Sequence, residues 1–305
     1  MTSRLVLATI VVIALLIGGN FTALKFALDH TTPLLLAGMR TVIGSSFLIG
    51  LALLRGERLP TRPRDLANIF AVSLSITTIS SGLLVMGVSR VTAGLASLIA
   101  GTMPLFTAVL TVVLLRTTVS RTGVIGLAVG FVGTVVLASP SLGGSSAAVG
   151  VGLLVLSALA WAFGNVYMKW QDFSSVSPVM LVGVQLAMSA SVLIPVALVA
   201  EGTADTDWST GLLYPLLYAA IPANAVTFAL LATVATRATP TQAAASAYLV
   251  PVFGVTFGWL IRDERLGLAE GLGGILIVVG VYLVVTAAAR TASAAPASQP
   301  EVPSR

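Results

Sequence analysis

Two asparagines occupy matching places in two long apolar stretches of the chain. Asn20 and Asn165 each follow a glycine and lie within runs that carry no charged residue. A carboxamide both donates and accepts hydrogen bonds, so it suits a zwitterionic or hydroxylated ligand. The alternative is a hydrogen bond between two helices. Both interpretations fit two side chains brought together by an axis of symmetry.

Other polar and aromatic residues are spaced to share helix faces with these amides. Residues four positions apart lie on one face of a helix. Three such pairs occur, with Tyr248 close to the third: Trp161 with Asn165, Asn224 with Phe228, and Gln242 with Ser246. Small-molecule sites usually combine aromatic walls with a few convergent polar groups. We therefore predict that these residues and Asn20 line a substrate site. For each aromatic ring, the filling of a gap in the core is the alternative.

Two prolines fall in the middle of apolar stretches. Pro104 and Pro251 each remove a backbone hydrogen bond from a helix. The carbonyl groups freed in this way are tolerated at membrane depth where they are buried or line a cavity. The sequence predicts kinked helices beside the cavity, with a packing kink as the alternative.

Arg40 is the charged residue that lies deepest within an apolar stretch. It falls about seven residues into its helix, roughly 10 Å at 1.5 Å per residue. We expect it to reach the membrane interface or to pair with Asp29; binding of a substrate carboxylate is the third option. No Asp or Glu lies in the middle of such a stretch, which favours uniport or exchange over proton coupling. Glu264 remains the candidate for a proton route.

Several kinds of chemistry are excluded by composition. The chain has no Cys and a single His, His30, so disulfides, Cys-based metal or redox sites and His-rich metal sites are excluded. No Gly-rich loop ends in the Lys-Ser/Thr pair that holds phosphates, and no Ser-His-Asp arrangement can form. We predict no cofactor, no metal and no enzyme activity.

The composition indicates a membrane protein. Of 305 residues, 57% are hydrophobic and only 9% are charged, where soluble chains carry about a quarter. The mean hydropathy is +1.03. Apolar stretches of about 20 residues predict membrane-spanning helices. The predicted spans are 5–28, 34–54, 66–88, 91–115, 121–138, 149–169, 178–200, 210–235, 240–261 and 268–288. The fold class is therefore an all-α integral membrane protein with ten transmembrane helices, and the lipid bilayer is its partner.

The basic residues predict orientation and argue against a nucleic-acid partner, because they are scattered among the connections. If the N-terminus is cytoplasmic, eleven Lys and Arg lie on the inner side and four on the outer. Cytoplasmic loops carry the excess of such residues. We expect a multi-pass protein of the cell membrane with both termini in the cytoplasm.

The two halves of the chain resemble each other. At a shift of 145 or 147 the matches include Asn20 with Asn165, Pro33 with Pro178, Arg40 with Gln185, Arg90 with Arg237, and Pro104 with Pro251. Because each half holds five helices, the second must insert upside down. We predict two inverted five-helix repeats, 1–139 and 149–288, joined by a linker at 140–148 and followed by a disordered cytoplasmic tail at 289–305. Inverted repeats are typical of secondary transporters; a static scaffold is the alternative.

Several motifs follow one another in order along the chain, and some of them occur in both halves. They are Gly18-Gly19-Asn20-Phe21 with Lys25, Pro33 and Arg40, Pro104-Leu105-Phe106, Trp161-Ala162 before Asn165, Tyr248-Leu249-Val250-Pro251-Val252-Phe253, and Asp263-Glu264-Arg265-Leu266 before a Gly-rich last helix. Through them the chain resembles the drug/metabolite transporter superfamily in its ten-helix EamA-type branch, over nearly all of 5–288. The resemblance implies a carrier for small metabolites, often amino acids and frequently outward.

We therefore predict a secondary transporter that exports small metabolites, amino acids or related amphipathic compounds, by alternating access. A broad-specificity exporter of hydrophobic or toxic compounds is one alternative. A membrane scaffold or lipid-handling protein is another.

The spacings Gly126-x3-Gly130 and Gly267-x3-Gly271 permit close helix contact. They predict either packing within the chain or a homodimer.

Overall fold

The chain forms an all-helical bundle in the computed structural model, which describes residues 3–116, 119–228, 230–231 and 240–294. The first half comprises α1 (Ser3–Leu28), α2 (Pro33–Leu54), α3 (Pro63–Ser73), η1 (Leu74–Ile79), α4 (Ser80–Val88), α5 (Ala93–Ala100), α6 (Met103–Leu115), α7 (Arg121–Ala138) and the short η2 (Ser139–Gly143). The second half comprises α8 (Ser145–Met168), α9 (Pro178–Ala200), α10 (Thr210–Ala220), η3 (Ile221–Val226), α12 (Pro240–Arg262) and α13 (Leu268–Ala294). No strand occurs within the described ranges.

The helices have the length and surface of membrane spans. Among the described residues, eight helical stretches are long and apolar enough to cross a bilayer, and two shorter apolar helices accompany them, Thr210–Val226 and Tyr248–Arg262. Large apolar side chains such as Val135, Val199 and Ile275 are exposed. Exposed apolar surface on this scale suits contact with lipid. The chain is an integral membrane protein of ten helical spans, as predicted.

Most helix ends lie close to their predicted positions. α7 and α9 have the predicted bounds, whereas α8 begins at Ser145, four residues early, and α13 continues to Ala294. Gly144 is extended and precedes the first turn of α8, a position that glycine tolerates well. The bend between the halves is therefore shorter than the predicted linker, and the last helix is longer than predicted.

The orientation of the two halves follows from contacts at both ends of α2. The backbone N–H of Leu34, at the start of α2, donates to a Glu201 carboxylate oxygen just after α9, over 2.9 Å. Beyond the end of α2, Glu57 accepts a hydrogen bond from Ser177, the residue before α9. α2 and α9 are therefore antiparallel. Because they are equivalent helices of the two halves, the second half is inverted relative to the first.

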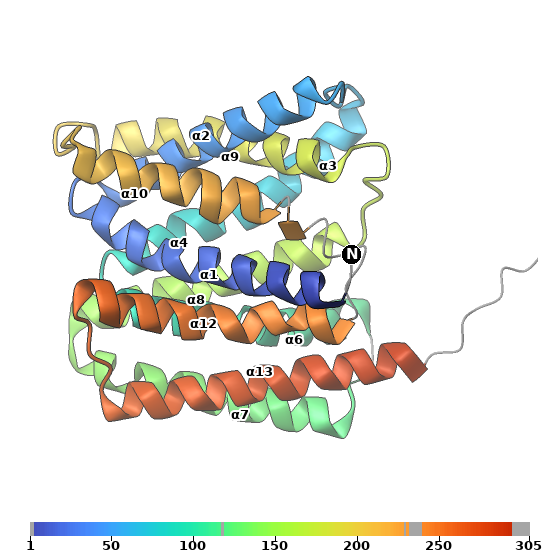
Figure 1. The fold of residues 1–305 in the computed structure, drawn as a ribbon, viewed down its shortest axis with the longest axis vertical. Coiled ribbons are helices and arrows are strands. Elements are labelled where there is room, and N and C mark those ends of the chain that lie inside the picture. Colours follow the sequence, from blue (N-terminus) through green and yellow to red (C-terminus); the bar gives the residue numbers. More distant parts are fainter. Residues whose placement is uncertain (1–2, 117–118, 229, 232–239, 295–305) are drawn as a thin grey trace, which may run out of the picture.

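Helix packing also obeys this symmetry (Figure 1). α2 packs on α9, and α7 packs on α13 at the opposite edge of the bundle. Between these edges, α1 packs on α12 and α10, while α8 packs on α6 and α4. Exchanging the two halves converts the first set of contacts into the second. The chain is thus built from two inverted five-helix repeats.

Glycines allow α7 and α13 to approach closely. A Cβ atom on Gly126 would lie 2.8 Å from the Gly280 carbonyl oxygen, and one on Gly280 would lie 2.5 Å from the Gly130 Cα. The Gly126-x3-Gly130 spacing therefore serves packing within the chain. Gly271 has no neighbour within 4 Å of an added Cβ. Homodimer formation stays a prediction.

Each half contains a short π-helical segment in its third span. η1 spans Leu74–Ile79 and η3 spans Ile221–Val226, at the same shift of 147 that relates later parts of the halves. Segments of this kind widen a helix by one residue per turn and are frequent at functional sites. Both π segments lie beside the central cavity described next.

Candidate functional site: a cavity between the two repeats

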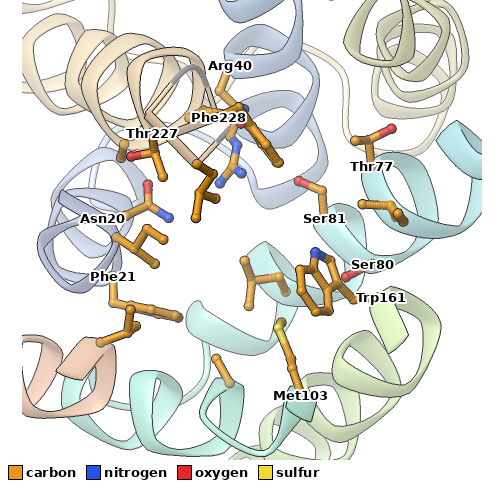
Figure 2. Close-up of a pocket in the computed structure, with 18 of the residues that line it drawn as sticks. Asn20, Phe21, Arg40, Thr77, Ser80, Ser81, Met103, Trp161, Thr227 and Phe228 are labelled. Carbon is orange, nitrogen blue, oxygen red and sulfur yellow. The ribbon is translucent and has the colours of Figure 1, made fainter. Parts of the chain in front are cut away.

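A cavity of about 320 Å³ lies in the middle of the bundle, within the size range of small-molecule sites, about 300–1,000 Å³. Helices of both halves line it (Figure 2). Its polar side chains are Asn20, Arg40, Thr41, Thr77, Ser80, Ser81, Asn224 and Thr227. Its aromatic side chains are Phe21, Trp161 and Phe228, with Met103 beside them. Such a lining can hold a small molecule that is partly polar and partly apolar.

The two π segments place equivalent polar residues on this cavity. Thr77 of η1 and Asn224 of η3 are 147 residues apart, and both line it. The Thr77 hydroxyl donates to the Ser73 carbonyl at 2.8 Å, and the Thr227 hydroxyl donates to the Pro222 carbonyl at 3.0 Å. These bonds satisfy backbone oxygens near the widened turns, which is required at membrane depth.

The two prolines act differently from each other. Pro104 lies at the start of α6, because the fourth span is broken at Gly101 and Thr102 into α5 and α6. The fourth span is therefore interrupted directly before Pro104, where the sequence predicts a kink, and the proline occupies the first turn of α6 without losing a bond. Pro251 does lie inside a continuous helix, α12. A Cβ on Gly101 would come within 2.7 Å of the Pro251 ring, so the break and the proline are in contact.

Four of the predicted site residues line the cavity. Asn20, Trp161, Asn224 and Phe228 come from α1, α8, η3 and the turn that follows it. Asn20 is only 8% exposed, and its Oδ1 has no hydrogen-bond partner among the described residues. A buried oxygen without a partner is costly. Asn20 thus lines the cavity, and Figure 2 shows its amide nitrogen toward the open space and its oxygen toward Thr227.

Other predicted residues lie elsewhere. The Asn165 amide donates to the Trp161 carbonyl of its own helix at 2.8 Å, and Asn165 does not line this cavity. Tyr248 is also off the cavity and packs edge-on against Tyr282, with ring centroids 6.1 Å apart. The two asparagines hold equivalent positions but make different contacts, because the Asn165 amide bonds to its own backbone. The side chains of residues 242 and 246 lie outside the described part of the structure.

Arg40 neither reaches the membrane interface nor pairs with Asp29, the two environments expected for it. It lines the cavity and is 9% exposed, so it does not extend to the membrane interface. Asp29, its expected partner, instead accepts a hydrogen bond from Arg262 at 2.9 Å. The Arg40 Nε and Nη1 atoms have no partner within the described residues. Helix α2 therefore delivers an unpaired guanidinium group to the cavity.

Sequence reasoning missed several hydroxyl groups of the cavity: Thr41, Thr77, Ser80, Ser81 and Thr227. The repeat contained a usable signal for some of them. Shifting Asn224, Thr227 and Phe228 back by 147 leads to Thr77, Ser80 and Ser81. Hydroxyl residues are common in membrane helices and bond to their own backbone, so residue type alone does not single them out.

One end of the bundle is tied together across the two halves. This end, called the cap end, comprises the connections 29–32, 89–92, 201–209 and 263–267. There the Thr31 and Thr206 hydroxyl oxygens are 3.0 Å apart, and His30 Nδ1 lies 3.0 Å from an Asp207 carboxylate oxygen. Hydrogen bonds from Ser209 and from His30 hold the pKa of the Asp207 carboxyl below its usual range. Every one of these pairs except Ser209 with Asp207 joins the first half to the second.

Two carboxylates at the cap end bind helix N-termini. Glu201 accepts from the backbone N–H groups of Leu34 and Leu35, and Glu264 accepts from those of Ala93 and Gly94. Carboxylates are stabilising at helix N-termini, where the N–H groups are unpaired and the dipole is positive. Glu264 thus holds the start of α5, and both its oxygens are engaged.

Ten apolar helices in two inverted repeats around a polar and aromatic cavity define a membrane transporter, not an enzyme. The sequence matches the model of the EamA-like transporter family over residues 4–139 and 148–286. The chain belongs to this family.

Curated relatives and a solved structure agree with this assignment. The chain is 30% identical to the uncharacterized transporter YvbV of Bacillus subtilis, over 88% of each chain. It is 29% identical to a probable amino-acid metabolite efflux pump of Escherichia coli, over 92% of this chain and 94% of the relative. A crystal structure with 17% identity has a TM-score of 0.65 and covers 91% of this chain and 97% of its own. That structure supports the fold.

Proposed function

We propose that the protein exports small amphipathic metabolites, amino acids or related compounds, from the cell by alternating access at the central cavity. The observation that carries this proposal is the place of the cavity, between two inverted repeats that both contribute to its lining. In transporters of this design the halves rock around a fixed site near the middle of the membrane. A cavity at that place is where a substrate is bound.

The lining supports an amphipathic substrate. Asn20, Arg40 and Asn224 offer donors and acceptors, while Phe21 and Trp161 offer apolar walls. A relative over nearly the whole chain is named as a probable amino-acid metabolite efflux pump. Amino acids with apolar side chains combine both kinds of group.

Orientation decides which end of the cavity faces the cytoplasm, while the outward direction is proposed from the name of the efflux-pump relative. The excess of Lys and Arg on the connections shared with the N-terminus favours a cytoplasmic location for both termini, in the cell membrane. The cap end would then face outward.

A second candidate function is a broad-specificity exporter of hydrophobic or toxic compounds. The aromatic groups of Phe21, Trp161 and Phe228 on three sides of the cavity favour it. The two candidates differ in what they move: an exporter of this kind raises tolerance to several unrelated toxic compounds when overproduced, whereas an amino-acid exporter raises tolerance to amino acids or their analogues.

Alternating access requires the cap end to open and close. The bonds between the halves at this end, such as Thr31 with Thr206, must then break during each cycle. A covalent bond at the same place would hold the cap end shut. The chain has no Cys of its own, so a disulfide can be introduced without background.

The first test is the double variant Thr31→Cys with Thr206→Cys. The two hydroxyl oxygens it replaces are 3.0 Å apart, which places two sulfur atoms within reach of a disulfide. In proteoliposomes loaded with labelled amino acids, an oxidant should stop efflux and a thiol reductant should restore it. We expect a loss of more than about 90% of the flux, because a disulfide does not open on the time of transport.

Each single cysteine variant is the control and should transport equally with and without oxidant. Full flux through the oxidised, cross-linked double variant would contradict alternating access at this end. Absence of flux for every amino acid, amine and drug tested, with the protein still folded, would contradict the proposed transport itself.

A further inference from the structure

Arg40 gives the cavity a single formal charge. It is the only Lys, Arg, Asp or Glu among the residues that line the cavity in the described part of the chain. Figure 2 shows its guanidinium group extending from α2 into the open space, opposite Met103 and Trp161. The wall is therefore positive, and no described residue of the lining carries a balancing charge.

Outside the lining, too, the described residues contain no counterion for this charge. Asp29, the nearest acidic candidate in the sequence, is bound to Arg262, which also lies 4.6 Å from the centre of the Phe26 ring. No ion pair of Arg40 occurs within the described residues, and its Nε and Nη1 atoms are buried without partners there. A buried charge without a partner is strongly unfavourable. An anionic ligand in the cavity would supply the missing partner.

Two polar side chains on other walls of the cavity, those of Asn20 and Ser81, indicate what else the ligand carries. Asn20 Oδ1 and Ser81 Oγ are also buried and without partners among the described residues. Asn20 lies on α1 and Ser81 on α4, on different sides of the space that the Arg40 guanidinium enters (Figure 2). An amide oxygen accepts hydrogen bonds, as an ammonium or hydroxyl group requires. Donors from Arg40 and the carboxamide of Asn20, which carries both a donor and an acceptor, together match a zwitterion.

The repeat shows that this charge is specific to one half. The position equivalent to Arg40 is Gln185, which is buried on α9 but does not line the cavity. A fold built by duplication needs no arginine at this position, since its counterpart is neutral. The charge on the cavity therefore comes from one half, and a neutral side chain fills the equivalent place in the other half.

We infer that Arg40 binds the carboxylate of the transported molecule, and that a carboxylate is required for recognition. Guanidinium and carboxylate form charge-assisted hydrogen bonds of matching geometry. The substrate class is a small monocarboxylate with an apolar side chain, preferentially an α-amino acid whose ammonium group faces Asn20. This inference rests on the proposed transport and adds to it that amines and esters without a free carboxylate are excluded.

The test uses four probes that differ in charged groups: phenylalanine, 3-phenylpropanoate, phenylalanine methyl ester and phenethylamine. Binding to the purified protein is measured by thermal stabilisation, and counterflow is measured in proteoliposomes. We expect the two acids to bind and move, and the ester and amine to do neither. Leucine with its methyl ester repeats the comparison for an aliphatic side chain.

The variant Arg40→Gln introduces the residue found at the equivalent position of the second half. It should weaken binding of both acids about tenfold to a hundredfold, as expected for a lost charge-assisted bond. Without ligand it should melt at the same temperature as the wild type or higher, because an unpaired buried charge is removed. Arg40→Lys keeps the charge and should retain part of the binding. The matched control Gln185→Ala should leave the preference for acids unchanged.

Two results would overturn the inference and leave transport standing. One is wild-type protein that binds or moves the ester or amine as well as the acid. The other is Arg40→Gln that folds and keeps the wild-type preference. If Arg40→Gln does not fold, the comparison of acids with esters on the wild type still decides. Transport of none of the probes by a protein that also moves no other amino acid contradicts the proposed function instead.

Discussion

The two repeats share a backbone plan but contribute different chemistry to the cavity. The first places Asn20 and Arg40 on the cavity, whereas the equivalent Asn165 bonds to its own helix and the equivalent Gln185 lies off the lining. In the third spans the amide comes from the second half, Asn224 of η3, and the first half supplies the hydroxyl of Thr77 of η1. Duplication thus provides a symmetric frame, and divergence of side chains provides one charged wall and one neutral wall.

An asymmetric site in a symmetric frame has a physical advantage. When the transporter rocks between its two states, each half takes up the packing that the other half had before. A symmetric backbone makes this exchange possible. Recognition of one orientation of a small molecule requires different groups on different sides, which symmetry of the side chains would prevent. We therefore expect substrate recognition at the positions where the two halves differ, and fold stability at the positions where they are alike.

The largest effect is expected where the halves are alike, at the contact of α7 with α13. In Gly273→Ala the new Cβ would lie 2.4 Å from the Leu137 nitrogen and 2.7 Å from the Gly133 carbonyl oxygen. Backbone atoms cannot move aside as a side chain can. The free energy of unfolding should therefore fall by at least about 1–3 kcal/mol. The measurement is the yield and melting temperature of the monodisperse protein in detergent.

Two further glycine variants sharpen this prediction. Gly126→Ala changes the equivalent position of the first half, where a Cβ would lie 2.8 Å from the Gly280 carbonyl oxygen, and should destabilise similarly. Gly271→Ala is on the same helix as Gly273 with open space around it, and should be neutral or slightly stabilising. Equal stability of all three variants would contradict close packing of α7 on α13.

The next effect separates the two asparagines. Asn20→Ala removes the carboxamide that lines the cavity and should reduce transport roughly tenfold, as for one lost hydrogen bond to the substrate. Asn165→Ala removes only a bond within its helix and should change transport less than about twofold. Initial rates of efflux from proteoliposomes measure both, after correction for the amount of protein inserted. Equal losses in the two variants would show that both halves contribute alike.

The smallest effect concerns the acidic connection 201–209, whose counterpart in the first half is rich in arginine. Because the pKa of Asp207 is lowered in the folded protein, its ionised form is stabilising. That contribution is complete above the ordinary Asp pKa of about 3.9 and is lost as the pH falls through the lowered pKa. Asp207→Asn should therefore lower the melting temperature slightly near pH 7, and the difference should vanish at the acidic limit.

Asp205→Asn is the matched control, because it removes the same charge from the same connection. The described residues contain no hydrogen bond of the Asp205 carboxylate that an exchange to Asn would break. Its melting temperature should stay parallel to that of the wild type across the pH range. If the melting temperature of Asp207→Asn stayed below that of the wild type by the same amount down to pH 2, the bonds from Ser209 and His30 would not depend on the charge of Asp207.

Much of the fold could be predicted from the sequence. Ten apolar stretches determine ten helices, because no other single-chain element of that length satisfies its backbone in lipid. The matches of Pro33 with Pro178 and Pro104 with Pro251, together with the odd number of spans in each half, determine the inversion. The π segments could not be predicted, since their residues are ordinary for a helix and the widening depends on what packs around them.

The site was only partly predictable. Asn224 and Phe228 were found from helix spacing and line the cavity, whereas Asn165 shares a helix face with Trp161 and yet bonds to its own backbone. Spacing fixes which side chains share a face, but not which rotamer each adopts or which partner it meets.

The sequence by itself determined the membrane location, the number of helices, the repeat and its inversion, because these follow from hydropathy, chain direction and self-similarity. The tertiary structure alone decided which residue of each equivalent pair meets the cavity. Asp29, the partner expected for Arg40, instead binds Arg262, a residue 233 positions away. Whether a buried charge is neutralised or left for a ligand depends on such contacts between distant segments, and local sequence carries no record of them.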